Sequence, residues 1–448
     1  MLVQDHAFGE HSCAADIPET LSFVDVFAGC GGLSLGLKQA GWNGLFAIEK
    51  NANAFETLDY NFREGARFGY HWPKAIERKP WDIAELIEQR GAALQAIAKG
   101  VDLIAGGPPC QGFSHAGRRR RDDPRNRLFE DYLRLVDMLQ PKLVLIENVR
   151  GFKSDFGSAE SGEIKNFAAT LIERLGHQYD ITSQILIASN FGVPQSRARF
   201  FVIGAKKSIF KSREIGSFFA NMEAEAAPFL TGQGLSLRQS AYDALSDLEV
   251  SRNGCKPSTE TPGFVAIDYS EPRSAFQRLM HLGCGTSLSD TRLARHRPEI
   301  RDRFEKIIKA CQEDGRLNTA LSAEMREAFQ IKKLAIRVMD RFQPAPTITS
   351  LPDDLLHYSE PRTLTVRENA RLQSFPDWFE FKGKYTTGGL RRRYETPRFT
   401  QVANAVPPLL AQQLGLALKR ILATSGYGGN DSGTNIIKCG TVIEKLFA

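Results

Sequence analysis

The feature that most constrains the fold is a pattern of short apolar runs that stop at glycines. Residues 21–27 lead into a glycine-rich turn at 28–32, and a helical pattern follows to about Ala40. Another apolar run, 101–105, stops at two glycines. Apolar runs of this length bounded by glycines are typical of buried parallel strands, and the order strand, glycine turn, helix is typical of nucleotide-cofactor domains. The sequence therefore predicts an α/β, Rossmann-like fold.

Composition limits the class of protein. At 448 residues the chain is long enough for two or three domains, and its 42% hydrophobic content can supply their cores. No run approaches the roughly 18 apolar residues of a membrane helix, and the polar residues 1–20 lack the pattern of a secretion signal. Seven cysteines without metal-ligand spacing argue against a metal site and against a disulfide scaffold. We therefore expect a cytoplasmic protein with no metal, and the net charge of +6 permits a polyanionic partner.

An acidic residue follows the second predicted strand. The run 44–48 ends at Glu49, about 20 residues after the first glycine of the turn. In dinucleotide-binding domains an acid at this place bonds the ribose hydroxyls of the cofactor. The alternative is that Glu49 only caps the helix predicted over 51–61. The glycine turn upstream favours the ligand role.

Cys110 follows the strand predicted over 101–105, within the segment Gly-Pro-Pro-Cys-Gln-Gly-Phe-Ser. In open α/β sheets, ligands bind at the carboxyl ends of the strands. A lone cysteine is more often a small buried residue. However, the two preceding prolines stiffen the backbone, and polar Gln111 and Ser114 follow, which favours a presented nucleophile.

This segment resembles the catalytic motif of DNA cytosine C5-methyltransferases of the bacterial restriction-modification type. Further segments resemble the family in the same order along the chain. They are the glycine loop with Asp25, Phe27, Gly29 and Gly31, the strand end Glu147-Asn148-Val149, the group Gln195, Arg197 and Arg199, the stretch 361–376, and the helix start 401–408, where Ala403 replaces the usual glycine. These similarities span about residues 22 to 415.

The resemblance implies a reaction and a cofactor. Cys110 would add to C6 of a cytosine flipped out of duplex DNA, Glu147 would act as an acid on its ring, and Arg197 and Arg199 would support the cytosine pocket. The methyl donor would be S-adenosyl-L-methionine, with Phe27 against the adenine. The implied cofactor-binding residues are Asp25, Phe27, Gly29, Gly31, Leu33, Glu49, Asp82, Pro108, Leu128, Asn404 and Val406. In the family the acid that Asp82 would match follows a third strand. Because Asp82 lies further along the chain from Glu49 than this match would require, we expect an insertion over roughly 62–78.

An arginine-rich stretch follows the nucleophile: six arginines lie within residues 117–127, among turn-forming residues. Such a run is usually a solvated charged segment. Because the family has a mobile loop here, the resemblance implies DNA contacts instead. The residues expected to contact DNA are Gln111, Ser114, Arg118, Arg119, Arg120 and Arg121.

The order of these segments predicts a domain organisation. We expect a leader at 1–20, a catalytic and cofactor-binding domain at 21–205, a smaller, irregular target-recognition domain at 206–390, a segment at 391–424 that returns to the catalytic domain, and a flexible tail at 425–448. The expected state is a monomer that binds double-stranded DNA, with a cognate restriction endonuclease acting separately.

Three alternatives stay open at this point. A tRNA cytosine-5 methyltransferase would share the catalytic domain, although the long region 206–345 favours DNA. A nicotinamide-dependent oxidoreductase would share the glycine loop but would not need the Cys110, Glu147 and Arg197 segments together. A non-catalytic DNA-binding regulator would not need Cys110 and Glu147.

Overall fold

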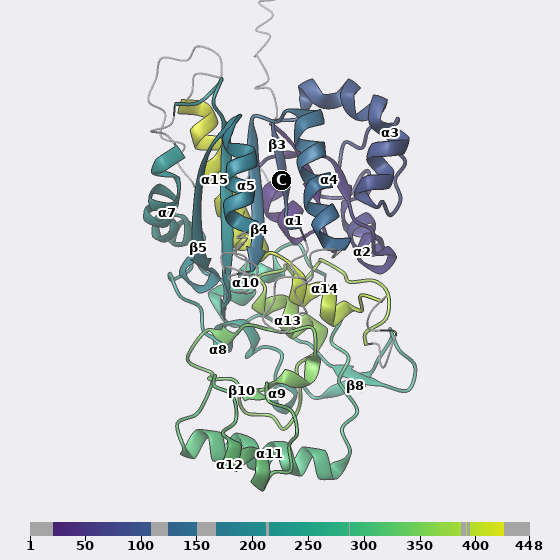
Figure 1. Cartoon of the computed structure of the whole chain (residues 1–448). Coiled ribbons are helices and arrows are strands. Elements are labelled where there is room, and N and C mark those ends of the chain that lie inside the picture. Colours follow the sequence, from purple (N-terminus) through teal and green to yellow (C-terminus); the bar gives the residue numbers. More distant parts are fainter. Residues whose placement is uncertain are drawn as a thin grey trace, which may run out of the picture.

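The structure, a computed structural model, describes residues 21–108, 124–149, 167–211, 215–285, 287–386, 391 and 395–424. Cys110, Gln111, Ser114 and Arg118–Arg121 lie outside these ranges, as do the predicted leader and tail. Within the described residues the chain forms an upper unit built on one large sheet and a lower unit of short helices and strands (Figure 1). The predicted α/β, Rossmann-like class is confirmed.

The upper unit holds a six-stranded sheet in the order β2-β1-β3-β4-β7-β5. Strands β1 to β4 run parallel, whereas β7 is antiparallel to both of its neighbours. The strands are β1 (Ser22–Val26), β2 (Asn43–Ile48), β3 (Leu103–Gly106), β4 (Leu143–Val149), β5 (Tyr179–Ile187) and β7 (Ala198–Lys206). β1 lies between β2 and β3, so the strand order reverses there, which is where cofactors bind in such sheets.

Alternate residues along the strands face two separate cores. Val24, Val26 and Ile104 face one core with helices α3, α4 and α5, and Phe23 and Leu103 face the other with α1 and α15 (Figure 1). The helices of this unit are α1 (Gly32–Gln39), α2 (Ala52–Phe62), α3 (Ile83–Ile97), α4 (Pro124–Leu139), α5 (Phe167–Gly176), α7 (Phe218–Gly232) and α15 (Pro408–Thr424), with the short turns η1 (Ala98–Gly100) and η3 (Ala188–Phe191). Helices on both faces explain why the central strands β1, β3 and β4 are mostly apolar.

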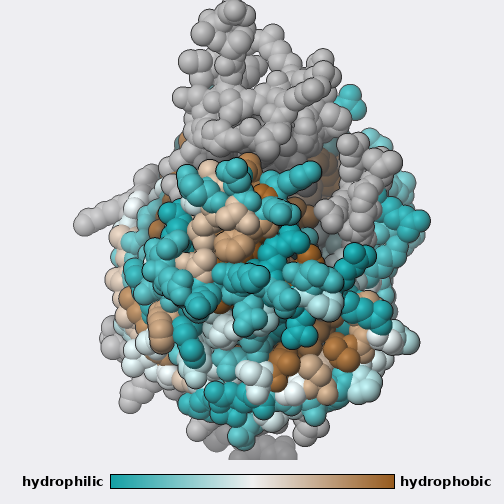
Figure 2. Space-filling model, turned by 90° about the horizontal axis from the view of Figure 1, so that it is seen from below, coloured by the Kyte–Doolittle hydropathy of each residue, from teal (hydrophilic) through white to brown (hydrophobic). Residues whose placement is uncertain are grey.

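The lower unit contains short elements around its own small core and a shared one. They are α8 (Ala241–Leu245), α9 (Val250–Asn253), α10 (Ala275–His281), α11 (Pro298–Glu313), α12 (Ala323–Ala328), α13 (Val366–Leu372) and α14 (Arg398–Asn404), η4 (Pro352–Asp354), and strands β8 (Cys255–Pro257), β9 (Val265–Ile267), β10 (Arg337–Val338) and β12 (Leu355–Leu356). A further pair, β6 (Gln195–Ser196) with β11 (Ala345–Pro346), joins the two units. Seen from below, the surface of this unit is mostly hydrophilic (Figure 2).

Helix α7 lies with the sheet, although its place after residue 206 had assigned it to the recognition domain. Gln184 of β5 donates a hydrogen bond to Glu223 of α7, and Arg420 of α15 pairs with Glu225. Leu230 of α7 packs against the left-handed Gly192 of the upper unit. Apolar packing of α7 against α15 and η3 thus places residues up to about 232 beside the sheet.

Residues 63–82, which include most of the expected insertion, contain no strand. Residues 63–82 form an irregular segment in which Tyr70 and Trp72 pack against the sheet, and Asp82 caps the start of α3 through a hydrogen bond from the Ala84 amide. The aromatic residues fill the space beside β2 without continuing the ladder of strands. No helix among the described residues is long and apolar enough to cross a membrane.

A buried arginine holds the lower unit together. Arg371 of α13 is fully buried and forms paired hydrogen bonds with Asp377 (2.5 and 2.6 Å) and with Asp247 (3.2 and 3.1 Å), which lies just after α8. His281, at the end of α10, lies 2.9 Å from the same Asp377 carboxylate. Three helices thus depend on one guanidinium group.

Replacing Arg371 with leucine should lower the free energy of unfolding by about 3–5 kcal/mol, because two carboxylates would stay buried without their cation. A urea titration followed by circular dichroism measures this change. The matched control is Arg420→Ala, which breaks the half-exposed pair with Glu225 and should cost less than about 1 kcal/mol. Equal losses for the two variants would show that the buried network does not stabilise the fold.

Candidate active site

Four chain segments meet at the carboxyl edge of the sheet. They are the turn after β1, the residues after β3, the end of β4 and the residues before β7. Because β7 is antiparallel to β4, its first residues lie beside the last residues of β4, with Val149 opposite Arg199. Residues widely separated in the sequence are thereby brought to one edge.

The turn after β1 is held by Glu49. One carboxylate oxygen accepts a hydrogen bond from the Gly29 amide at 2.9 Å, and the other accepts one from the Asn51 amide at 2.6 Å. Burial raises the pKa of Glu49, and these donors oppose the rise. Asn51, not Glu49, caps helix α2. The alternative role of Glu49 as a helix cap is therefore not what the structure shows.

Phe27 stands at the start of this turn with a positive φ of 60° and a ring that is only partly buried. A bulky residue with positive φ is strained, and such strain concentrates at ligand sites. Gly29 and Gly31 also have positive φ. Open space surrounds the position of a Cβ atom at Gly29, so a ligand can approach its backbone closely, whereas at Gly31 the Phe62 ring fills that space. The geometry suits the adenosine part of a nucleoside cofactor.

Residues 401–406, far along the chain, pack against this turn. A methyl group on Gly32 would overlap the carbonyl oxygen of Val406, so only glycine fits at that contact. Cys30 is buried beside the Gln401 carbonyl at 3.6 Å, and burial raises the pKa of its thiol to about 12, which makes it unreactive. Asn404 is exposed. The structure thus brings the 404–406 segment to the glycine turn.

The remaining predicted cofactor residues lie around the same turn. The Trp81 amide donates to the Glu49 carbonyl at 2.9 Å, which places Asp82 beside the end of β2. Both oxygens of Asp82 are already engaged, one by the Ala84 amide and one by Lys50 at 2.8 Å. Leu33 is buried at the start of α1, and Leu128 on α4 is partly buried.

Asp25 lies beneath the turn, where its side chain is only 1% exposed. One oxygen accepts a hydrogen bond from the Ser34 hydroxyl, which also contacts the Tyr70 hydroxyl at 2.5 Å, and Oδ1 has no partner. Burial raises the pKa of Asp25 to about 7. Asp25 therefore supports the turn from below, which differs from the direct cofactor contact expected from the sequence.

Glu147 lies two residues before the end of β4, next to the segment that leads to Cys110. Its Oε1 pairs with Arg199 Nε at 3.0 Å. Its Oε2 faces Gly107, where an added methyl carbon would lie 2.9 Å from that oxygen. The neighbouring Asn148 donates a hydrogen bond from its side chain to the Pro108 carbonyl at 3.1 Å. The carboxyl group and the approach to Cys110 are therefore fixed against each other.

Arg197 is the least satisfied group of the site. Its side chain is buried, and its Nε and Nη1 have no hydrogen-bond acceptor among the residues that the structure describes. Burial lowers its pKa to about 9, and the nearby Arg199 adds to this effect. Unpaired buried donors cost free energy, so they indicate a ligand that supplies acceptors. Sequence alternation placed both arginines on one face, but it could not indicate that Arg199 pairs with Glu147 while Arg197 stays free.

Gln195 has a structural role. Its side chain donates to the Leu372 carbonyl and to Gln373, and it accepts from the Ile348 amide. It therefore locks the residues before Arg197 to the lower unit.

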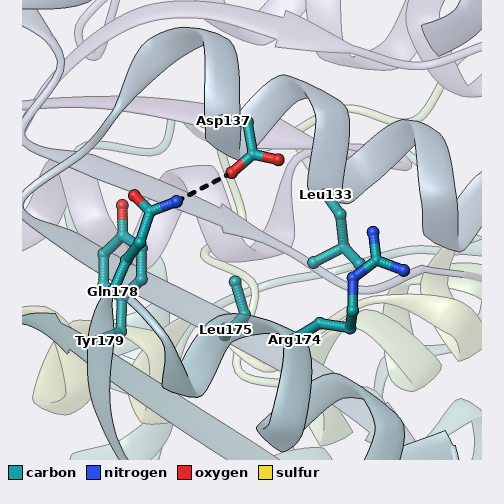
Figure 3. Close-up of a pocket in the computed structure, with 6 residues that line it drawn as sticks. All are labelled: Leu133, Asp137, Arg174, Leu175, Gln178 and Tyr179. Carbon is teal, nitrogen blue, oxygen red and sulfur yellow. Dashed lines mark hydrogen bonds between the residues drawn. The ribbon is translucent and has the colours of Figure 1, made fainter.

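The hollow in Figure 3 lies away from this site. It is lined by Leu133, Asp137, Arg174, Leu175, Gln178 and Tyr179, where Gln178 donates a hydrogen bond to Asp137. These residues come from the end of α4, from α5 and from the start of β5, which is the opposite edge of the sheet. None of them is a predicted site residue.

A Rossmann-like sheet with a glycine turn after the first strand and a carboxylate after the second is typical of domains that bind nucleotide-type cofactors. Comparison with known proteins makes the class specific. The sequence model of the C-5 cytosine-specific DNA methylase family matches residues 21–420, so the chain belongs to this family. It is a DNA (cytosine-5-)-methyltransferase, as the sequence predicted.

Individual relatives agree with this assignment. The chain is 33% identical over 401 residues to the type II methyltransferase M.DdeI of Desulfomicrobium norvegicum, covering 88% of this chain and 87% of that protein. It is 30% identical over 433 residues to M.XorII of Xanthomonas oryzae, covering 89% and 84%. A crystal structure described as a prophage-encoded DNA modification methyltransferase of E. coli shares the fold, with a TM-score of 0.60, 24% identity, and coverage of 90% of this chain and all of that one. These findings exclude the oxidoreductase and the non-catalytic regulator, and they favour DNA over tRNA.

Asp25 gives a prediction about pH. Its carboxyl keeps a proton up to about pH 7 when folded but only to about pH 4 when unfolded, so the raised pKa makes the free energy of unfolding fall as pH rises from about 4 to 7. Asp25→Asn cannot ionise. Its stability relative to wild type should therefore rise by about 2–3 kcal/mol between pH 5 and pH 8.

Urea titrations at the two pH values measure this difference, with the exposed Asp302→Asn on α11 as control. If Asp25→Asn and wild type keep the same difference at both pH values, Asp25 is charged in the folded protein and the account of this residue is wrong.

Proposed function

We propose that the protein transfers a methyl group from S-adenosylmethionine to C5 of a cytosine that is flipped out of a specific duplex DNA sequence, through a covalent bond between Cys110 and C6. The observation that carries the proposal is the pocket edge formed by Glu147, Arg199 and the unsatisfied Arg197, next to the segment that leads to Cys110. A flipped cytosine offers a carbonyl oxygen, a ring nitrogen and an amino group to such residues.

The cofactor would be held by residues of the glycine turn and its neighbours. Phe27 would lie against the adenine, Glu49 would bond the ribose, and Asp82 would lie near the adenine amino group. The partly exposed Phe27 ring and the open backbone at Gly29 fit a nucleoside. S-adenosylmethionine, a sulfonium, supplies the electrophilic methyl group.

Cys110 would act first. C5 of cytosine is a poor nucleophile, and addition of a thiolate at C6 breaks the aromaticity and makes C5 electron-rich. Only the thiolate attacks, and at a pKa of about 8.5 roughly a tenth of a free thiol is ionised near pH ~7.5. Arginines at the edge of the site favour the anion.

Glu147 would handle the charge that the adduct creates. The sulfur–carbon bond places negative charge on the ring, and Glu147 in its protonated form would relieve it by donating the proton to N3, which leaves a carboxylate that Arg199 stabilises. Arg199 pairs with Oε1 of Glu147, so Oε2, on the Gly107 side, would be the oxygen that faces the cytosine ring. Arg197 would donate to the cytosine carbonyl and so satisfy its own buried N–H groups. After methylation, loss of the C5 proton breaks the bond to sulfur and restores the aromatic ring.

The similarity to type II methyltransferases supports a place in a restriction-modification system, with a separate cognate endonuclease. A monomeric enzyme is part of the proposal. Cytoplasmic location is part of the same proposal. Tritium from labelled S-adenosylmethionine should enter duplex DNA and not tRNA. Bisulfite sequencing of a plasmid that expresses the enzyme should reveal one methylated sequence. Label in tRNA alone would overturn the choice of substrate.

Two variants should show that different residues control methyl transfer and cofactor binding. Glu147→Gln should lower kcat by about 10²- to 10⁴-fold, the usual value of a lost acid, and leave cofactor affinity unchanged. Phe27→Ala should instead weaken cofactor binding by about tenfold, through the loss of one stacked ring.

Isothermal titration calorimetry with S-adenosylhomocysteine and single-turnover methylation measure the two effects. Loss of cofactor affinity in Glu147→Gln, with methylation intact in Phe27→Ala, would show that the two sites are assigned the wrong way round.

A further inference from the structure

Strand β5 forms one edge of the six-stranded sheet. All nine of its residues pair with β7 on one side, and no strand of the described residues pairs with its other side. Proteins usually protect such an edge from other chains with lysine, proline or a bulge. β5 contains none of these, its register with β7 is unbroken, and its residues 180–185 are only partly buried. A long, regular edge of this kind favours the addition of a further strand.

Apolar side chains lie along this edge on the face that α5 covers. Ile181 and Ile185 pack partly into the core that α5 shares with the sheet. Ile187 has the same face by alternation and is 42% exposed. The open edge of β5 is therefore apolar on one face.

Helix α5 extends this apolar surface with Ile172, which is 38% exposed. Arg174 pairs with Glu130 of α4 at 3.3 Å, so the flank of α5 that carries Arg174 faces α4. At 3.6 residues per turn, Ile172 lies about 200° around the helix from Arg174. Because α5 lies between α4 and β5, Ile172 is on the flank toward the edge of the sheet (Figure 1). We call Ile172, Ile181, Ile185 and Ile187 the isoleucine strip.

Helix α15 ends near the start of this edge. Lys419, in its last turns, donates to the carbonyl of Gly41 at 2.9 Å, and Gly41 lies just before β2. This contact places the end of α15 at the amino ends of the parallel strands. β5 begins at the same end, because β5 and β4 are both antiparallel to β7. Helix α7 bridges α15 and β5 through its ion pair with one and its hydrogen bond to the other.

The sequence after α15 can reach this edge and suits it. Residues 425–448 lie outside the described ranges; they comprise a Gly-, Ser- and Asn-rich stretch at 425–435 and then Ile-Ile-Lys-Cys-Gly-Thr-Val-Ile at 436–443. Eleven extended residues span up to roughly 36–40 Å, which exceeds the about 10–12 Å diameter of a helix such as α7. If 436–443 is extended, Ile437 and Ile443 share one face and Lys438 lies on the other.

The two faces of such a strand would match the two sides of the β5 edge. Its isoleucines would meet the isoleucine strip. Lys438 would lie on the opposite side, where Gln184 of β5 bonds Glu223 of α7 and where Glu225 also lies. The β-branched residues of 436–443 also favour a strand.

We propose that residues 436–443 add a strand to the open edge of β5, with Ile437 and Ile443 on the isoleucine strip and Lys438 toward the acids of α7. A short flexible connection gives an effective concentration on the order of millimolar, so a contact that is weak between separate molecules holds within one chain. The added strand closes the edge against a second copy of the protein. This inference does not depend on the methylation reaction.

Hydrogen exchange of the full chain, read by mass spectrometry, tests the proposal. In the double variant Ile437→Asp, Ile443→Asp, peptides from β5 should exchange about tenfold faster or more than in wild type, because two buried apolar contacts are lost. Peptides from β1 to β4 should keep their wild-type exchange, which shows that the fold is intact. The matched control, Ser425→Asp with Ser432→Asp, adds the same charge to the connecting stretch and should change nothing.

A variant on the other side of the contact completes the design. Ile172→Lys should speed exchange in residues 436–443, whereas Leu334→Lys, at a 67% exposed position of the lower unit, should not. Equal exchange of β5 in wild type and in the double variant would overturn the inference. Protection of β5 that disappears on dilution, together with dimers seen by light scattering, would show that a second copy covers the edge and would overturn it as well.

Discussion

The ion pair between Glu147 and Arg199 is the interaction on which the arrangement of the site depends. It is possible because β7 runs antiparallel to β4, so that the first residues of one strand meet the last residues of the other. The two residues are diagonal neighbours across these strands, close enough for long side chains to meet. A sheet with only parallel strands would have placed Arg199 at the opposite edge.

The Glu147–Arg199 pair lies between two chain segments that are far apart in the sequence. On one side, Asn148 holds the Pro108 carbonyl and Gly107 leaves room for the Glu147 carboxyl group. On the other, Arg197 is buried with two free N–H groups, and Gln195 anchors its segment to α13 of the lower unit. The position of Arg197 beside Glu147 therefore depends on contacts between the upper and lower units. Because Gln195 bonds to α13, this position also depends on the buried network around Arg371, which lies on the same helix.

Much of the upper unit could be predicted from the sequence because its signals are local. Apolar runs that stop at glycines indicated β1 and β3, and Glu49 directly follows β2 while Glu147 lies two residues before the end of β4. Other features depend on packing between distant segments, which local patterns do not record. Aromatic residues fill the space before Asp82, α7 packs beside the sheet against α15, and the Asp25 side chain lies beneath the glycine turn and accepts from Ser34. Nothing in the sequence indicates that two N–H groups of Arg197 are buried without acceptors among the described residues.

The most direct test of the account is a covalent trap. Duplex DNA with 5-fluorocytosine at the target position, together with S-adenosylmethionine, should form a denaturation-resistant complex with the wild type, because fluorine cannot leave C5 as a proton does. Mass spectrometry of a protease digest should place the bond on Cys110. Cys110→Ala should bind cofactor normally and form no complex. A bond at another residue, or methylation of ordinary DNA by Cys110→Ala, would contradict the account.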